Sequence, residues 1–411
     1  MWNRYKISCQ TCEKITNLRL QIPEKEILEV SFNCLNCSSE IKGTLHVNLE
    51  KANFHLNMKR GSIVYGHPDE GDYFSEYSDT IITNKPSTEF HDLMLPTLRL
   101  PREHFHALKE RKDYRLLFSD DTWDDLKDLT RAYIKFDKSN IEKLGRKILG
   151  NKNGYADYLD CTIEPDFHRI YFLSLNHMIY PWIDFDNHKD FVLWLTQNVF
   201  IEKNIVALRE FVDVFDEDVC ERIREDIGGL LIRFIDLRNY FLYANPVELK
   251  NDGYVAIHNF NQLKTFYTDC FEFMGKTSQY VFCLQNLFER GSQNNVPLGS
   301  PKNVTDAESF ARLKHGSKLP IIELSTEANF KNLYKDCFDN KLRNGINHFS
   351  VKIDEQTQFI TYFPLEKDPT QEFTILYIDF LNKSLELFNS VLKMGQIMKM
   401  VSNLRGFGLG G

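Results

Sequence analysis

Four cysteines near the N-terminus constrain what this chain can fold into more than any other feature. Two residues separate Cys9 from Cys12 and Cys34 from Cys37, and 21 residues lie between the two pairs. Two thiolates from each tight turn complete a tetrahedron around Zn²⁺, and about 20 residues are enough for a hairpin between the turns. Four Cys ligands leave no open coordination position, so the pattern predicts one structural, non-catalytic Zn²⁺ per chain. The alternative is four reduced cysteines in a small β unit.

The residues around the cysteine pairs do not decide what such a unit binds. It resembles zinc ribbons, which bind either nucleic acid or protein. Basic residues are offset by acidic ones here: Arg4, Lys6, Lys14 and Arg19 against Glu13, Glu24, Glu26 and Glu29. We therefore expect a zinc ribbon whose partner, nucleic acid or protein, is left open.

The size and charge of the chain limit its class. A length of 411 residues is too great for one average domain, so two or three domains are expected. Lys and Arg number 50 against 58 Asp and Glu, and this net charge of −8 argues against a surface coated in positive charge. No apolar run reaches the roughly 18–20 residues that span a bilayer, and the N-terminus lacks the apolar stretch of a signal peptide. We expect a cytoplasmic protein with no membrane partner.

The spacing of apolar residues predicts a mainly α fold preceded by a small β region. Strands are predicted at 44–49, 54–58 and 62–65, and irregular connections at 66–105. Helices are predicted from about Asp120 onward and at 188–211, 216–244, 258–290, 326–348 and 371–404. A β-hairpin is predicted from 349–353 and 358–363, between the last two helices.

These patterns divide the chain into five regions. They are a zinc ribbon at 1–45, a β-rich or irregular regulatory region at 46–118, a helical connecting region at 119–187, a helical domain at 188–404 and a flexible tail at 405–411. The helical domain contains the residues whose types and spacing point to chemistry.

The helix predicted at 326–348 ends on the sequence Arg343-Asn344-Gly345-Ile346-Asn347-His348. An imidazole can take the proton from an RNA 2′-hydroxyl, and a fixed guanidinium can hold the phosphate that the hydroxyl attacks. At about 100° per residue, the four polar side chains share one arc of the helix, opposite an apolar face. Arg343 and His348 still diverge by about 140°. Two copies facing each other across a twofold axis would therefore converge on one phosphate better than one copy.

Two further features of this helix bear on its role. Gly345 lacks a side chain, which would let a backbone or a partner helix approach closely. The alternative interpretation of the whole motif is a solvent-exposed polar face without chemistry, because Arg and His at this spacing are common by chance.

Residues 337–363 resemble the signature of the HEPN superfamily. In that family, Arg, a polar residue and three further residues precede His late in a helix. In many bacterial defence members a short hairpin and then a long helix follow. Asn344 fills the polar position here, and the predicted hairpin and helix follow. The resemblance covers about residues 190–404, although only 337–363 contains specific residues.

The resemblance implies a C-terminal HEPN-like helical bundle with a small β-hairpin, forming a homodimer or a higher oligomer through the motif helix. It also implies a metal-independent endoribonuclease of the toxin-like, abortive-infection type, acting on RNA in anti-phage defence and triggered by a phage or regulatory protein. His348 would be the base or proton shuttle, Arg343 would bind the scissile phosphate, and Asn344 would orient His348 or the phosphate. The products would be a 2′,3′-cyclic phosphate and a 5′-hydroxyl, with no cofactor for catalysis.

One position departs from the family pattern. In members paired with a nucleotidyltransferase antitoxin, a Tyr follows the His by four positions, and Lys352 stands there instead. The sequence therefore does not support control by such an antitoxin. Between Phe310 and Lys352, eight basic residues face four acidic ones, an excess of +4 that predicts a phosphate-facing surface.

A different class of function fits the same sequence. The helical domain would then be a non-catalytic dimerising or nucleotide-binding scaffold, and the zinc ribbon would bind nucleic acid or a partner protein.

Overall fold

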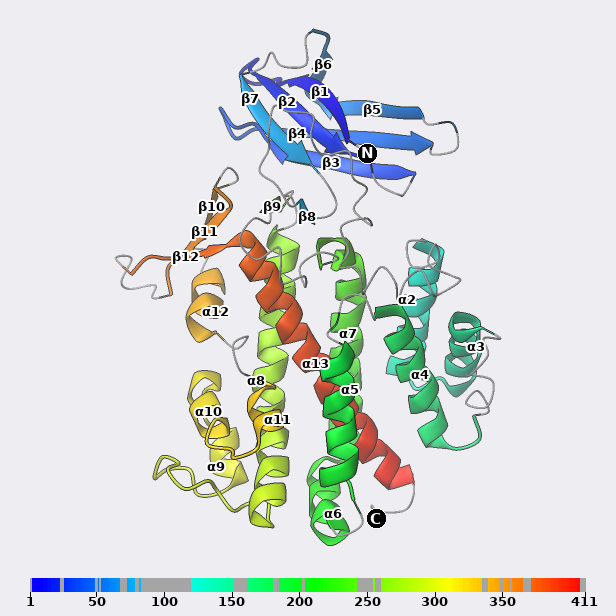
Figure 1. Cartoon of the computed structure of the whole chain (residues 1–411), viewed down its shortest axis with the longest axis vertical. Helices are drawn as coiled ribbons and strands as arrows, with labels where there is room; N and C mark the ends of the chain where they lie inside the picture. Colours follow the sequence, from blue (N-terminus) through cyan, green and yellow to red (C-terminus); the bar gives the residue numbers. More distant parts are fainter. Residues whose placement is uncertain are drawn as a thin grey trace.

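The computed structural model of the chain describes residues 2–22, 26–48, 51, 53–66, 72–77, 81–82, 120–150, 161–179, 183, 185–201, 204–241, 254–255, 260–334, 339–347, 351–354, 357–364 and 371–406. As Figure 1 shows, the N-terminal strands lie at one end of a mainly helical body, and a second small sheet lies near α12. None of the described helices is long and apolar enough to cross a membrane.

The N-terminal strands form two small sheets. The strands are β1 (Trp2–Ser8), β2 (Ile15–Gln21), β3 (Ile27–Asn33), β4 (Glu40–Asn48), β5 (Asn53–Arg60), β6 (Ser62–Val64) and β7 (Tyr73–Tyr77). One sheet has the order β6-β1-β2-β7 and the other the order β3-β4-β5. Alternate residues of these strands are buried, and they form a hydrophobic core of their own that includes Ile7, Leu18, Val30, Phe32, Ile41, Leu45 and Leu56.

Strand β7 was not predicted, because residues 66–105 read as irregular connections. It pairs in parallel with β2. Asp72, just before β7, explains the pairing: its Oδ2 accepts a hydrogen bond from the Ile15 amide at 2.9 Å, and its Oδ1 lies 3.1 Å from Lys14 Nζ. These contacts fix the start of β7 beside the start of β2, and no local sequence pattern reports such a long-range contact.

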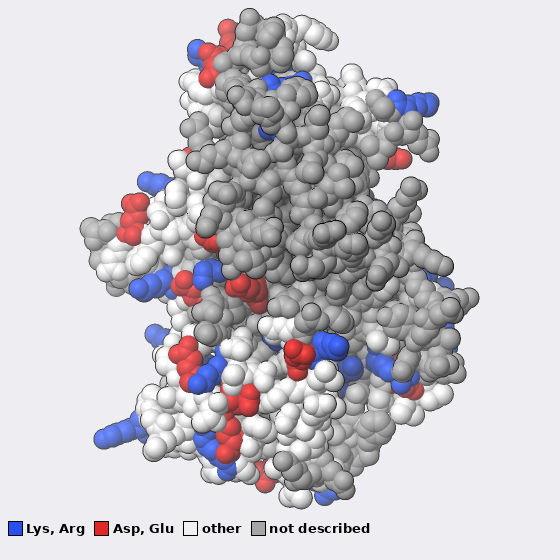
Figure 2. Space-filling model, in the orientation of Figure 1, with Lys and Arg blue, Asp and Glu red and all other residues white. Residues whose placement is uncertain are grey.

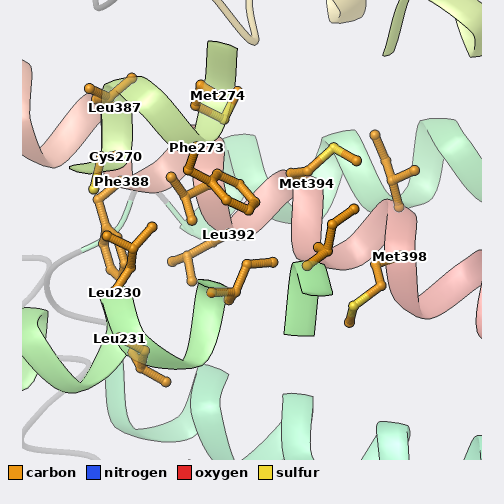
Figure 3. Close-up of a cluster of buried hydrophobic side chains, with 14 of the residues drawn as sticks. Leu230, Leu231, Cys270, Phe273, Met274, Leu387, Phe388, Leu392, Met394 and Met398 are labelled. Carbon is orange, nitrogen blue, oxygen red and sulfur yellow. The ribbon is translucent and has the colours of Figure 1, made fainter. Parts of the chain in front are cut away.

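Three long helices form the centre of the helical body. They are α7 (Glu217–Phe241), α8 (Phe260–Arg290) and α13 (Tyr377–Gly406), and α13 crosses the other two at a slant (Figure 1). Figure 3 shows side chains from all three meeting in one apolar cluster, for example Leu230, Phe273 and Met394. Phe388 of α13 is fully buried, and its ring stacks on Phe234 of α7 with the centroids 4.5 Å apart.

Shorter helices pack on both sides of this centre. On the α7 side lie α2 (Asp120–Ile134), α3 (Lys138–Leu149) and α4 (Glu164–Ile179). On the α8 side lie α9 (Ala307–Ala311), α10 (His315–Ile322), α11 (Ala328–Lys331) and α12 (Asn340–Asn347). A two-residue ladder between β8 (Ile81–Ile82) and β9 (Tyr254–Val255) pairs the N-terminal part of the chain with the connection between α7 and α8.

The helix predicted at 188–211 is interrupted. The chain forms α5 (Phe185–Trp194), a π-helical turn η5 (Leu195–Val199) and then α6 (Ile205–Val214). The Asn204 side chain donates hydrogen bonds to the carbonyls of Asn198 and Val199, at 3.0 and 2.9 Å. It thereby satisfies the end of the π turn just before α6 begins, a role that the apolar spacing did not reveal.

The helix predicted at 326–348 is also wrong as a single element. It consists of α11, a turn at 332–334, and α12. Asp339 starts α12, because its Oδ1 accepts hydrogen bonds from the amides of Lys341 and Leu342, both at 3.0 Å. An Asp side chain that accepts hydrogen bonds from the backbone amides just after it favours the start of a new helix over continuation of the preceding one.

The predicted hairpin is confirmed and gains a third strand. Strands β10 (Lys352–Asp354), β11 (Phe359–Tyr362) and β12 (Phe373–Leu376) form an antiparallel sheet in that order. Strand β12 occupies the start of the helix predicted at 371–404, so α13 begins only at Tyr377. The helix that contains Arg343 is therefore followed by the hairpin, the third strand and then the long helix α13.

Candidate functional site

The four predicted cysteines converge at the end of the N-terminal β unit. Their sulfur atoms all lie within 4.8 Å of one another. Cys9 Sγ lies 3.7 Å from Cys37 Sγ, and Cys12 Sγ lies 3.6 Å from Cys34 Sγ. Four thiolates at about 2.3 Å from a tetrahedral metal stand about 3.8 Å apart, whereas a disulfide needs about 2 Å. The cluster therefore has the size of a four-thiolate metal centre.

The two cysteine turns have matching backbone geometry. The residue after each second cysteine has a left-handed backbone, with φ of 60° at Glu13 and 59° at Ser38. Its amide donates to the carbonyl of the first cysteine of the turn, at 2.9 Å for Cys9 and 2.8 Å for Cys34. Each turn therefore points its two sulfur atoms to the same side, as a shared metal requires.

Hydrogen bonding and burial act on the thiols of the second turn in opposite directions. Hydrogen bonds from Ser39 lower the pKa of Cys37. Burial raises the pKa of Cys34. A bound cation would favour the thiolate at both positions, because metal ligation deprotonates a coordinating thiol.

Helix α12 holds Arg343 and Asn347 on the side that faces α8. Leu342 and Ile346 are fully buried and anchor the helix. Arg343 donates from Nε to Glu272 Oε1 of α8 at 2.9 Å, and its Nη2 forms an ion pair with the same oxygen. One turn later, Asn347 Oδ1 accepts a hydrogen bond from Thr268 Oγ1 of α8 at 2.9 Å. The polar face predicted for this helix is thus docked on α8 and is not a free surface.

The structure describes two of the three predicted catalytic residues, Arg343 and Asn344. Asn344 contacts Arg343 itself, because its Oδ1 accepts a hydrogen bond from Arg343 Nη1 at 3.0 Å. His348 lies outside the described residues. The Arg343 and Glu272 side chains are each 29% exposed, so the ion pair is half-buried but still reachable from solvent.

Gly345 has a specific packing role. A Cβ atom at this position would lie 2.5 Å from the Tyr362 ring of β11, which is too close for any side chain. Gly345 therefore lets the three-stranded sheet pack directly on α12. The close approach that the sequence suggested is made by this aromatic ring of the same chain.

Two residues that the motif did not predict complete the cluster. Glu272 Oε2 lies 3.3 Å from Nδ1 of His315, the first residue of α10. One carboxylate thus faces a guanidinium with one oxygen and an imidazole with the other. A sequence signal existed for Glu272: Thr268, Asp269, Glu272 and Lys276 are spaced so that they share one face of the helix. His315 had no such signal, because its neighbours in sequence show no pattern.

A cleft of about 270 Å³ lies on the α7 side of this stripe. It is lined by four carboxylates (Glu225, Asp226, Asp269 and Glu272) but only two cations (Arg233 and Lys276), besides Gly229, Leu230 and Phe273. Its charge is wrong for a phosphate backbone. A phosphate group that approached from this cleft would be repelled by these carboxylates.

The segment at 310–352 is less basic in effect than its composition suggests. Arg312 forms an ion pair with Glu308, and Lys318 is buried with its Nζ 3.5 Å from the Gly275 carbonyl. Lys314, Lys341 and Lys352 are exposed. On the face shown in Figure 2, basic and acidic side chains alternate over the described helical part without a patch of one sign. A broad phosphate-binding surface is therefore not visible on that face.

No protein-family model, curated protein or solved structure matches this chain.

The four-cysteine cluster leads to a test of metal binding. We expect one tightly bound metal ion per purified chain, and loss of that ion in the Cys34→Ser variant, because three thiolates and a hydroxyl hold a soft cation poorly. The β unit should then become sensitive to protease, since metal binding and folding are coupled in such units. Elemental analysis and limited proteolysis measure both. Cys161→Ser, outside the cluster, is the control, and equal metal content in the two variants would contradict the assignment.

The contacts of His315 lead to a test of its protonation. Burial is the main cause that lowers the pKa of His315 below 6.5, Lys318, Arg343 and Lys276 lower it further, and Glu272 raises it. The ring should therefore be neutral at pH 7. In Glu272→Gln the pKa should fall again, because the carboxylate that raises it is lost. Titration of the ring ¹⁵N signals measures this, and a pKa above 6.5, or an increase in the variant, would contradict the geometry.

Proposed function

We propose that this protein is a metal-independent endoribonuclease of the HEPN type. RNA is the substrate, Arg343 binds the scissile phosphate, His348 moves the proton, and Asn344 holds the guanidinium in place. The observation that supports this most is the fixed, half-buried Arg343 of α12, joined to Glu272 and Asn344 by three hydrogen bonds. A pre-positioned cation stabilises a phosphorane-like transition state without reorganisation during the reaction.

The hydrogen bonds of Arg343 leave room for a phosphate. A guanidinium has five N–H donors, and the described residues of the chain engage three of them, which leaves two. Two donors match the bidentate contact that Arg makes with a phosphate group. The elements after the motif also support the proposal, because hairpin β10–β11 and the long helix α13 follow α12 in the order of the family pattern.

We infer that the metal of the four-cysteine cluster is Zn²⁺ with a structural role. Four thiolates with tetrahedral spacing are the preferred environment of this ion, and they leave no position for substrate. The ribbon and the strands that pair with it would then form the regulatory part, binding nucleic acid or a phage or host protein that triggers the enzyme.

A homodimer, or a higher oligomer, is part of the same proposal. Arg343 points to α8 of its own chain, and on an ideal helix a residue five positions later would be turned by about 140° from it. A second copy would supply the imidazole that one copy directs elsewhere. Such an RNase, acting in the cytoplasm as an abortive-infection toxin, would serve anti-phage defence.

One observation favours the non-catalytic alternative. The Arg343–Glu272 ion pair and the Asn347–Thr268 hydrogen bond join α12 to α8 at two successive turns. Contacts of this kind also fit a purely structural role in a dimerising or nucleotide-binding scaffold.

Cleavage assays separate the two functions. Purified protein should cleave total cellular RNA in the presence of EDTA, and Arg343→Ala should lower the rate about 10²–10³-fold, as expected when a transition-state donor is removed. His348→Ala should be comparably impaired. Arg312→Ala removes an exposed Arg that pairs with Glu308, and it is the matched control that should retain activity. Equal cleavage by wild type, Arg343→Ala and His348→Ala would exclude the nuclease site.

A mixing experiment tests the composite site. If Arg343 of one copy acts with His348 of the other, then a mixture of the two inactive variants contains dimers with one complete site. Random pairing should restore about a quarter of the wild-type rate, because half of the dimers are mixed and each has one complete site of two. No recovery in exchanged dimers would place both residues of each site in one chain.

A further inference from the structure

His315 is the one described histidine that shares a carboxylate with the motif arginine. Its ring lies against the backbone of α8 at Gly275, where an added Cβ would be 2.3 Å from Nδ1. Only glycine permits this approach, and it brings Nδ1 to 3.3 Å from Glu272 Oε2. A second close approach, of Asn340 of α12 to Gly316 of α10, packs the two short helices together. His315 and Arg343 are therefore held on the two oxygens of one carboxylate.

The position of Glu272 decides which nitrogen of His315 is available. A carboxylate beside Nδ1 favours the tautomer with the proton on Nδ1, which leaves a lone pair on Nε2. Among the described residues, none hydrogen-bonds to Nε2. The side chain is 28% exposed, so the ring can be reached from solvent.

The charges around the ring suit a base that works on a phosphodiester. Facing His315 are Glu272 and Lys276 of α8, Lys318 of α10 and Arg343 of α12. Three cations and one anion attract a phosphate group and disfavour protonation of the imidazole. Burial of the ring acts in the same direction. A neutral imidazole next to a fixed guanidinium is the arrangement that proton abstraction beside a phosphate requires.

We propose that His315 is a second imidazole of the nuclease site and its general base, which rests on the function proposed above. Nε2 of His315 takes the proton as the O2′–H bond breaks and the new bond from O2′ to phosphorus forms. The P–O5′ bond breaks, and the departing O5′ takes a proton from the His348 imidazolium. Glu272 is a positioning residue that orients the ring, and Arg343 holds the phosphate. The base and the phosphate-binding group then come from one chain.

The test uses the full-length protein and a fluorophore–quencher oligoribonucleotide of mixed sequence, without divalent metal, from pH 5 to 9. His315→Ala should lower kcat about 10²–10⁴-fold with little change in KM, and the fall in rate at acid pH should disappear. Added imidazole should restore activity at least about tenfold, because the truncation opens space over Gly275 for it. His55→Gln, on an exposed position of β5, is the control and should match wild type.

A second variant makes the result independent of truncation. Gly275→Ala places a methyl group where the ring now lies, and the half-exposed ring can swing away from Glu272. Because Ala is the better helix former, the fold should be kept, as checked by circular dichroism and thermal unfolding. The variant should nevertheless lose activity and the acid limb of the pH profile, and added imidazole should not rescue Arg343→Ala.

The outcomes separate this inference from the proposed function. If Arg343→Ala and His348→Ala lose cleavage but His315→Ala stays within threefold of wild type, His315 is not the base, and the nuclease assignment stands. Loss in His315→Ala without imidazole rescue and with an unchanged pH profile likewise overturns the inference, because it indicates a structural role. If wild type and Arg343→Ala cleave equally, the proposed function itself fails and this inference with it.

Discussion

Helix α8 has to satisfy two different neighbours, and the arrangement of the helical body depends on how it does so. Its apolar side packs against α7 and α13, where Phe266 and Phe273 are buried. Its other side presents the stripe from Thr268 to Lys276. A carboxylate such as Glu272 in a half-buried position is destabilising without partners. Arg343 and His315 supply them, and this pairing fixes where α12 and α10 dock.

In the proposed site, the same contacts also orient Arg343 for binding a phosphate. Two N–H groups of Arg343 converge on one oxygen of Glu272, and a third is held by Asn344. A lysine could not replace this arginine in the proposed site. Its ammonium group lacks the planar fork that makes these hydrogen bonds and still offers two parallel donors to a phosphate. The guanidinium is therefore both anchored and available. The acidic cleft between α7 and α8 restricts that availability to one side, because its carboxylates repel a phosphate backbone.

The sequence predicted the elements whose causes are local. The cysteine spacing identified the four-cysteine cluster, alternation identified β4, β5 and the hairpin, and apolar spacing identified α7 and α8 nearly to their ends. Predictions failed where one side chain acts on distant or neighbouring backbone, as Asp72 does at β7, Asn204 after the π turn and Asp339 at α12.

The candidate site, like the fold, could be predicted only in part from the sequence. The Arg-Asn pair and its amphipathic helix could be identified because they lie within eight consecutive residues. Glu272 lies 71 positions from Arg343, and His315 meets it because Gly275 allows α10 to approach α8 closely. Pairings of this kind follow from tertiary packing, which no periodicity reports. The polar face of α12, for which a solvent-exposed surface was the alternative interpretation, is docked on α8 for the same reason.

The chemistry of the RNA ends tests the central claim most directly. Attack by a 2′-hydroxyl, assisted by imidazole and guanidinium, leaves one kind of product whatever the sequence cut. RNA treated with the purified protein in EDTA can be analysed for its termini by mass spectrometry. The account predicts 2′,3′-cyclic phosphate and 5′-hydroxyl ends that are absent with Arg343→Ala. Ends with 3′-hydroxyl and 5′-phosphate, or RNA that stays intact, would contradict it.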